Sequence, residues 1–233
     1  PENLKQLCTR YGIRPSKAYG QHYLIDTEPI DAMVAAAELG VGETVVEVGP
    51  GFGVLTFALA ETGATIFAFE IEKKLMLFWD EKLKEFSNVE IIWGNVLQQL
   101  KTISEKLKGN WKVVANLPYQ ITSHLLRTLL EMENKPERII VMVQKEVAER
   151  ICAKAGDMSM LAVSVQYYGE PKIIAKVSRG SFWPSPKVDS VVLCIKTLKS
   201  RGTTRDPDFT SGHKNIKTFS DEIFFRVVKA GFT

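Results

Sequence analysis

Apolar and polar positions along the chain follow two alternating patterns. Short runs rich in β-branched residues are typical of buried strands, and stretches whose apolar residues recur every three or four positions are typical of helices. The short runs predict strands at 44–48, 65–69, 89–93, 112–115 and 138–143. The longer stretches predict helices at 54–62, 72–86, 96–107, 122–132, 145–153 and 159–168. Strands that alternate with helices predict a doubly wound, Rossmann-like α/β fold, with a mostly parallel sheet covered on both faces.

The two ends of this alternation differ from its middle. The first 26 residues are mostly polar, and a helix is expected to follow them, with Asp26 or Thr27 as its cap and Pro29 in its first turn. The last two predicted strands, 172–177 and 188–196, are joined by a proline-rich loop instead of a helix. Such a pair predicts an antiparallel hairpin at the edge of the sheet.

A change of composition near the end of the chain predicts its domain organisation. Residues 199–217 contain Gly, Ser, Thr, Asp, Pro and basic residues with few apolar ones, which indicates a linker or mobile loop. Ser220 then caps a predicted helix at 221–229, whose apolar residues are expected to lack packing partners. We therefore expect one α/β domain at 1–198, a linker at 199–217 and a helical segment at 218–233.

Composition and charge exclude several classes of protein. With 45% apolar and 24% charged residues the chain is an ordinary globular protein. No apolar run reaches the roughly 20 residues that span a bilayer, and the charges throughout Pro1–Arg14 argue against a signal peptide. The three cysteines and three histidines are scattered, which predicts neither disulfides nor a metal site and indicates a reducing, cytoplasmic compartment. The net charge of +3 permits a nucleic-acid partner without indicating one.

A glycine-rich turn follows the first predicted strand, with the sequence Gly49-Pro50-Gly51-Phe52-Gly53. Glycines at a strand-to-helix turn let a ligand approach the backbone, but Pro50 removes an amide that would cradle a phosphate. Glu70 ends the next strand, where a carboxylate can accept hydrogen bonds from both ribose hydroxyls. A nucleoside bound without a pyrophosphate points to S-adenosylmethionine. The alternative is a tight turn beside a solvated glutamate.

Asn95 follows the third predicted strand and allows two interpretations. Its amide could pair with the adenine edge of the cofactor. Asparagine is equally well suited to capping the helix that begins next to it.

The fourth predicted strand ends in Asn116-Leu117-Pro118-Tyr119, a segment without a titratable general base. The Asn116 side chain and the Pro118 carbonyl could accept both hydrogens of an adenine N6 amine and favour the pyramidal nitrogen of a transition state. Tyr119 could stack on the base. The plainer interpretation is a β-turn, since Asn and Pro are turn formers. Farther along, Phe182 or Trp183 could form a second wall for the base, although the loop could equally be an ordinary sheet edge.

These segments together resemble the rRNA adenine N6,N6-dimethyltransferase family from Pro15 to Phe232. The resemblance rests on several motifs in the family's order: Gly20–Leu24, Glu47–Thr56, Glu70, Asn116–Tyr119, Gln144–Ile151 and Phe182–Ser190. It implies transfer of methyl groups from S-adenosylmethionine to two adjacent adenines near the 3′ end of small-subunit rRNA. The implied partner is the immature small ribosomal subunit, and we expect a monomer without a metal.

The resemblance also implies roles for individual residues. The residues implied to contact the cofactor are Gln21, His22, Leu24, Gly49, Gly51, Glu70, Asn95 and Asn116. The residues implied to hold the target base are Asn116, Pro118, Tyr119 and Phe182. The base must leave its stack to reach them.

Three departures from the family pattern are visible. His22 stands where the family usually has Asn, and Asn95 stands where Asp is usual. Family members also continue past a Gly-Phe pair like Gly231-Phe232 into a basic segment and a small helical domain. We therefore expect 218–233 to be the start of a truncated helical RNA-binding domain.

Two other functions fit the same motifs. One is a large-subunit rRNA adenine methyltransferase that confers antibiotic resistance, although the Pro15–Leu24 segment looks more like the small-subunit group. The other is a ribosome-assembly or transcription factor that uses the fold without catalysis, against which the intact Asn116–Tyr119 motif and Glu70 argue.

Overall fold

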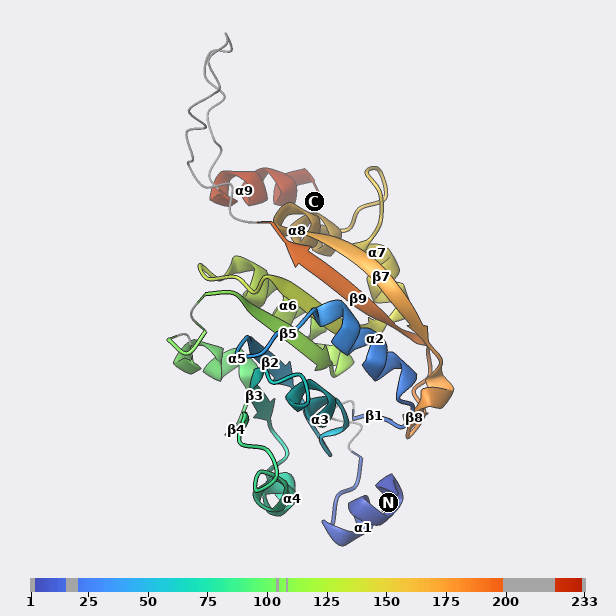
Figure 1. Cartoon of the computed structure of the whole chain (residues 1–233). Coiled ribbons are helices and arrows are strands. Elements are labelled where there is room, and N and C mark those ends of the chain that lie inside the picture. Colours follow the sequence, from blue (N-terminus) through green and yellow to red (C-terminus); the bar gives the residue numbers. More distant parts are fainter. Residues whose placement is uncertain (1–2, 16–20, 104, 108, 199–220, 232–233) are drawn as a thin grey trace.

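A seven-stranded sheet forms the centre of the computed structural model, which describes residues 3–15, 21–103, 105–107, 109–198 and 221–231 (Figure 1). The strands run in the order β4-β3-β2-β5-β6-β9-β7. Their bounds are β2 (Thr44–Val48), β3 (Thr65–Glu70), β4 (Val89–Trp93), β5 (Trp111–Asn116), β6 (Arg138–Gln144), β7 (Gly169–Val177) and β9 (Ser190–Thr197). Strands β4, β3, β2, β5 and β6 are parallel, and β9 is antiparallel to both β6 and β7. The predicted parallel sheet with an antiparallel edge pair is confirmed.

Helices cover both faces of this sheet, as predicted. On one face lie α2 (Glu28–Ala37) and α3 (Val54–Ala60), and on the other lie α5 (Val96–Gln99), α6 (Thr122–Glu131), α7 (Lys145–Ile151) and α8 (Met160–Tyr168). Successive side chains of a strand point to opposite faces, so Val45 packs under α2 and α3 while Val46 packs with α6. Both valines are fully buried, which explains why apolar residues follow one another along this strand instead of alternating with polar ones.

Two predicted helices are shorter than their apolar pattern suggests. The stretch 72–86 forms the 3₁₀ turn η1 (Lys73–Leu75) and α4 (Met76–Lys82), and the stretch 96–107 forms α5 followed by the 3₁₀ turn η2 (Leu100–Ile103). In the second stretch Leu100 and Ile103 are both buried. A spacing of three also suits a 3₁₀ turn, so buried apolar residues could not distinguish it from an α-helix. Two further short turns are η3 (Tyr119–Ile121) and η4 (Arg179–Ser181).

The polar N-terminal region contains elements that the pattern did not predict. Helix α1 (Leu4–Arg10) begins with a capping box between Asn3 and Gln6. Its apolar side packs with Phe52 and Trp79 in a third hydrophobic cluster. Strand β1 (Tyr23–Leu24) pairs antiparallel with β8 (Phe182–Trp183), far away in the chain. The capping box was a local signal for α1, whereas nothing local indicates the β1–β8 pairing.

The last helix, α9 (Asp221–Gly231), packs against α8 (Figure 1). The ring centroids of Tyr167 and Phe224 lie 4.3 Å apart, and Phe225 contacts both Tyr167 and Tyr168. The expectation that the apolar residues of this helix lack partners is therefore wrong, because α8 offers two partly buried tyrosine rings. The predicted linker 199–217 lies outside the described residues. None of the helices in the described part is long and apolar enough to cross a membrane.

Candidate active site

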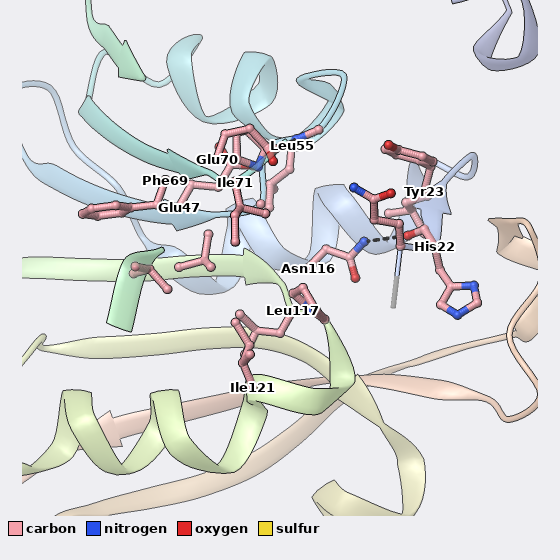
Figure 2. Close-up of a pocket in the computed structure, with 18 of the residues that line it drawn as sticks. His22, Tyr23, Glu47, Leu55, Phe69, Glu70, Ile71, Asn116, Leu117 and Ile121 are labelled. Carbon is pink, nitrogen blue, oxygen red and sulfur yellow. Dashed lines mark hydrogen bonds between the residues drawn. The ribbon is translucent and has the colours of Figure 1, made fainter. Parts of the chain in front are cut away.

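A cavity of about 420 Å³ lies where β2, β3 and β5 end. That volume is typical of small-molecule sites, and the carboxyl ends of parallel strands are where doubly wound sheets bind ligands. The predicted site residues that line it are Gln21, His22, Leu24, Gly49, Gly51, Glu70, Asn95, Asn116, Pro118 and Tyr119. These predicted residues come from five separate segments of the chain and meet around one space (Figure 2).

The glycine turn at the end of β2 needs its glycines for local reasons. Gly49, Gly51 and Gly53 all have positive φ, at 72°, 55° and 77°, where side chains are disfavoured. A Cβ on Gly51 would lie 3.0 Å from the Tyr23 ring. The Trp79 indole N–H donates to the Gly51 carbonyl over 3.1 Å. Tyr23 and Trp79 both contact Gly51 and thus hold the turn in one conformation.

Glu70 ends β3 and is only 4% exposed. Its Oε2 accepts a hydrogen bond from the Gly51 N–H at 3.0 Å, and its Oε1 accepts one from the Glu72 N–H at 2.7 Å. Burial raises the pKa of this carboxyl, and the two backbone donors oppose that rise. Each oxygen keeps a further lone pair for a ligand hydroxyl. The alternative of a solvated glutamate is excluded, because Glu70 is buried and braces the turn.

Asn116 lies at the end of β5, and its side-chain orientation follows from one hydrogen bond. The amide Nδ2 donates to the His22 backbone carbonyl over 3.3 Å (Figure 2). A carbonyl oxygen can only accept, so the nitrogen must face His22 and the Oδ1 of Asn116 is left as an acceptor. The Pro118 carbonyl accepts from the Ile121 N–H at 3.2 Å within η3, and its second lone pair remains. The turn interpretation of this segment is correct, and the turn carries two acceptors.

Tyr119 and Asn95 are also held by local contacts. The Tyr119 hydroxyl is hydrogen-bonded to Ser190 Oγ at 2.8 Å. Asn95 caps α5, with its side-chain oxygen accepting from the Leu97 N–H at 3.0 Å. The capping interpretation of Asn95 is thus confirmed, and the residue also borders the cavity.

Comparisons with known proteins agree with this geometry. The family model described as "Ribosomal RNA adenine dimethylase" matches residues 13–208. The chain belongs to the ribosomal RNA adenine dimethylase family.

Relatives of this dimethylase-family chain include proteins with known names and structures. It is 39% identical over 98% of its length to "Ribosomal RNA small subunit methyltransferase A" from Dehalococcoides mccartyi, and it spans 74% of that protein. A dimethyladenosine transferase structure from Plasmodium falciparum superposes with a TM-score of 0.66 at 28% identity, covering 76% of this chain and 64% of that one. The 23S rRNA methyltransferase ErmE gives 0.65 at 29% identity, covering 76% of this chain and 70% of that one.

One functional candidate in this family member was not singled out from its sequence. Glu47 on β2 is 1% exposed and lines the cavity. Its Oε2 has no hydrogen-bond partner among the described residues. Burial raises the pKa of this carboxyl to about 8, and the nearby Glu70 adds to the rise. The valines on either side of Glu47 indicated a strand but not a buried carboxyl, because the burial of Glu47 depends on the surrounding helices.

The raised pKa of Glu47 predicts a specific pH dependence of stability. Between the ordinary carboxyl pKa of 4.5 and the folded value of about 8, the folded protein binds a proton that the unfolded chain does not. The contribution of the Glu47 carboxyl to the free energy of unfolding is therefore fully present below about pH 4.5, and it is lost as the pH rises through 8. We expect Glu47→Gln to flatten this decline, as measured by calorimetric Tm between pH 5 and 9. Equal pH slopes for Glu47→Gln and wild type would contradict the prediction, and Glu133→Gln at an exposed site is the matched control.

Phe182 is the one predicted site residue that the structure does not bring to the cavity. Its ring is 3% exposed and packs in the core opposite Leu24, its partner in the β1–β8 pair. Trp183 is partly exposed, and Lys5 Nζ lies 6.0 Å from its ring centroid. Among the described residues, no group of three or more His, Cys, Asp or Glu side chains could hold a metal.

Proposed function

We propose that this chain dimethylates N6 of two adjacent adenines near the 3′ end of small-subunit rRNA, with S-adenosylmethionine as the methyl donor. Family membership supports the reaction class, and the name of the Dehalococcoides relative supports the small subunit as target. The observation that carries the proposal is the orientation of Asn116, which leaves its Oδ1 as an acceptor in the same cavity as Glu70 and the glycine turn.

The residues of the cavity fit S-adenosylmethionine. Backbone at Gly49 and Gly51 gives a ligand close approach, and the buried Glu70 carboxylate suits ribose hydroxyls. The unpartnered Oε2 of Glu47 suits a cationic or hydrogen-donating group. When bound, this cofactor supplies an electrophilic methyl group on a sulfonium. The chain holds it through these residues and through the segment Gln21–Leu24, which also lines the cavity.

The target adenine is positioned by the Asn116–Tyr119 segment. The Asn116 Oδ1 and the Pro118 carbonyl accept hydrogen bonds from the two N6 hydrogens. These bonds draw the amine out of conjugation with the ring and favour attack by its lone pair on the methyl group. Tyr119 provides a stacking surface whose hydroxyl is tethered to Ser190. No covalent bond to the chain is needed, so positioning supplies most of the catalysis.

The choice between the two ribosomal subunits does not follow from the fold. The Plasmodium dimethyladenosine transferase and the 23S enzyme ErmE superpose almost equally well, with TM-scores of 0.66 and 0.65. The sequence comparison favours the small subunit, since the relative at 39% identity carries that name. We also propose that residues 1–198 form the methyltransferase domain and that the protein acts as a monomer in the cytoplasm, where it meets rRNA.

The experiment that tests this function is methyl transfer from labelled S-adenosylmethionine. Undermethylated small subunits and naked large-subunit rRNA are offered separately, and the nucleosides of each product are identified by mass spectrometry. We expect dimethyladenosine in the small-subunit RNA. Label in the large-subunit RNA alone would move the protein to the resistance group, and cofactor binding without any transfer would support a non-catalytic factor.

A further inference from the structure

The side chain of His22 does not point towards the cofactor turn. Figure 2 shows its imidazole directed away from Glu70 and Glu47, while its backbone carbonyl faces Asn116. The imidazole Nδ1 lies 2.7 Å from the Pro184 carbonyl oxygen. A carbonyl oxygen can only accept, so Nδ1 carries the proton of this hydrogen bond. The imidazole therefore binds the loop that follows β8.

The same imidazole also contacts the residue proposed to stack on the target base. The rings of His22 and Tyr119 are stacked, with centroids 5.8 Å apart and an interplanar angle of 27°. Tyr119 is tethered at its other end, through its hydroxyl, to Ser190. His22 thus touches the Asn116–Tyr119 segment twice, by its ring at Tyr119 and by its carbonyl at Asn116.

Segment 178–189, which His22 contacts at Pro184, is stabilised by hydrogen bonds between its own residues. Ser185 Oγ donates to the Arg179 carbonyl at 2.8 Å, and the Arg179 N–H donates to Asp189 Oδ1 at 3.0 Å. These contacts hold the loop together but do not reach the Asn116–Tyr119 segment. His22 and Ser190 make that connection among the described residues.

We propose that His22 is a positioning residue whose imidazole couples segment 178–189, made of η4, β8 and the loop after it, to the Asn116–Tyr119 segment that holds the target base. The inference rests on the proposed function and deepens it, because it assigns the His22 side chain to base positioning instead of cofactor binding. The backbone carbonyl of His22 orients Asn116, and its imidazole orients Tyr119 and the loop. Two ring nitrogens and a planar face allow one residue to make both contacts, which the asparagine usual in the family cannot do.

Two substitutions separate the two contacts of the imidazole. His22→Phe keeps a ring for Tyr119 but loses the donor to Pro184, and His22→Asn keeps a donor near the position of Nδ1 but loses the ring. His22→Phe should speed amide exchange in 178–189 by about fivefold, the factor for one lost hydrogen bond. His22→Asn should leave that exchange near the wild-type rate. His124→Phe, at an exposed histidine on α6, is the matched control.

Three readouts decide the proposal. For His22→Phe we expect the Kd for S-adenosylmethionine to stay within about twofold of wild type and kcat for rRNA methylation to fall about fivefold, in step with the loosened loop. Wild-type exchange rates in 178–189 would overturn the coupling, and a tenfold weaker cofactor Kd with an unchanged loop would return the side chain to cofactor binding. If the wild type methylates neither RNA, the proposed function fails, whereas amide exchange and Kd still decide the role of His22.

Discussion

Replacing Asn116 with alanine is expected to lower kcat for methyl transfer by about 10²–10³-fold, the loss typical of one preorganised polar group that acts in the transition state. The variant keeps the Pro118 carbonyl but loses the Oδ1 acceptor that the bond from Nδ2 to His22 directs away from that residue. Initial rates with saturating cofactor and RNA measure the effect. Circular dichroism should show an unchanged fold, because β5 is held by its neighbours β2 and β6.

The control for this variant is Asn110→Ala, at an exposed asparagine in the turn before β5. It removes the same side chain without touching the cavity, so its kcat should equal that of wild type. An Asn116→Ala enzyme that kept its kcat to within tenfold would remove the proposed role of the amide. The cofactor Kd is measured in parallel, because Asn116 also lines the cofactor cavity.

Replacing Glu70 with alanine is expected to weaken S-adenosylmethionine binding by about 100-fold or more. Each hydrogen bond to a charged group contributes about 1.5–3 kcal/mol, and the carboxylate is expected to accept from both ribose hydroxyls. The same carboxylate braces the Gly51 and Glu72 N–H groups, so the turn also loses its preorganisation. Titration calorimetry with the full chain measures the change in Kd.

Glu70→Gln distinguishes lost charge from lost bracing. Glutamine keeps one acceptor oxygen for the Gly51 N–H but presents a donor in place of the second oxygen. Its Kd should therefore lie between those of wild type and Glu70→Ala. Glu133→Ala, at an exposed carboxylate outside the cavity, should bind like wild type. A Glu70→Ala Kd within a few-fold of wild type would show that this carboxylate does not hold the ribose.

Strand positions were predictable because buried parallel strands have a simple composition. The run Thr44–Val48 begins and ends where the sequence predicts, and so does Val89–Trp93. Helix lengths were less predictable, since the buried residues Leu100 and Ile103 satisfy both an α-helical and a 3₁₀ spacing. Helix α9 shows another limit, because its partners Tyr167 and Tyr168 lie on a helix more than fifty residues earlier.

The candidate site was predictable to the extent that its chemistry lies in contiguous motifs. The glycine turn, Glu70 and the Asn116–Tyr119 segment each lie at the end of a strand, and the carboxyl ends of parallel strands meet at one edge. Phe182 was expected at this edge as well. It is buried opposite Leu24 instead, because the β1–β8 pair turns its side chain into the core.

The sequence by itself determined the order of strands and helices and the motifs at the strand ends, because these depend on neighbouring residues. Only the tertiary structure decided which atoms of the motifs face each other. The Asn116 amide is oriented by the carbonyl of a residue 94 positions earlier, and the Tyr119 hydroxyl is held by one 71 positions later. The raised pKa of Glu47 likewise arises from the helices that exclude water from β2. Hydrogen-bond direction and desolvation depend on distance in space, which residue order does not specify.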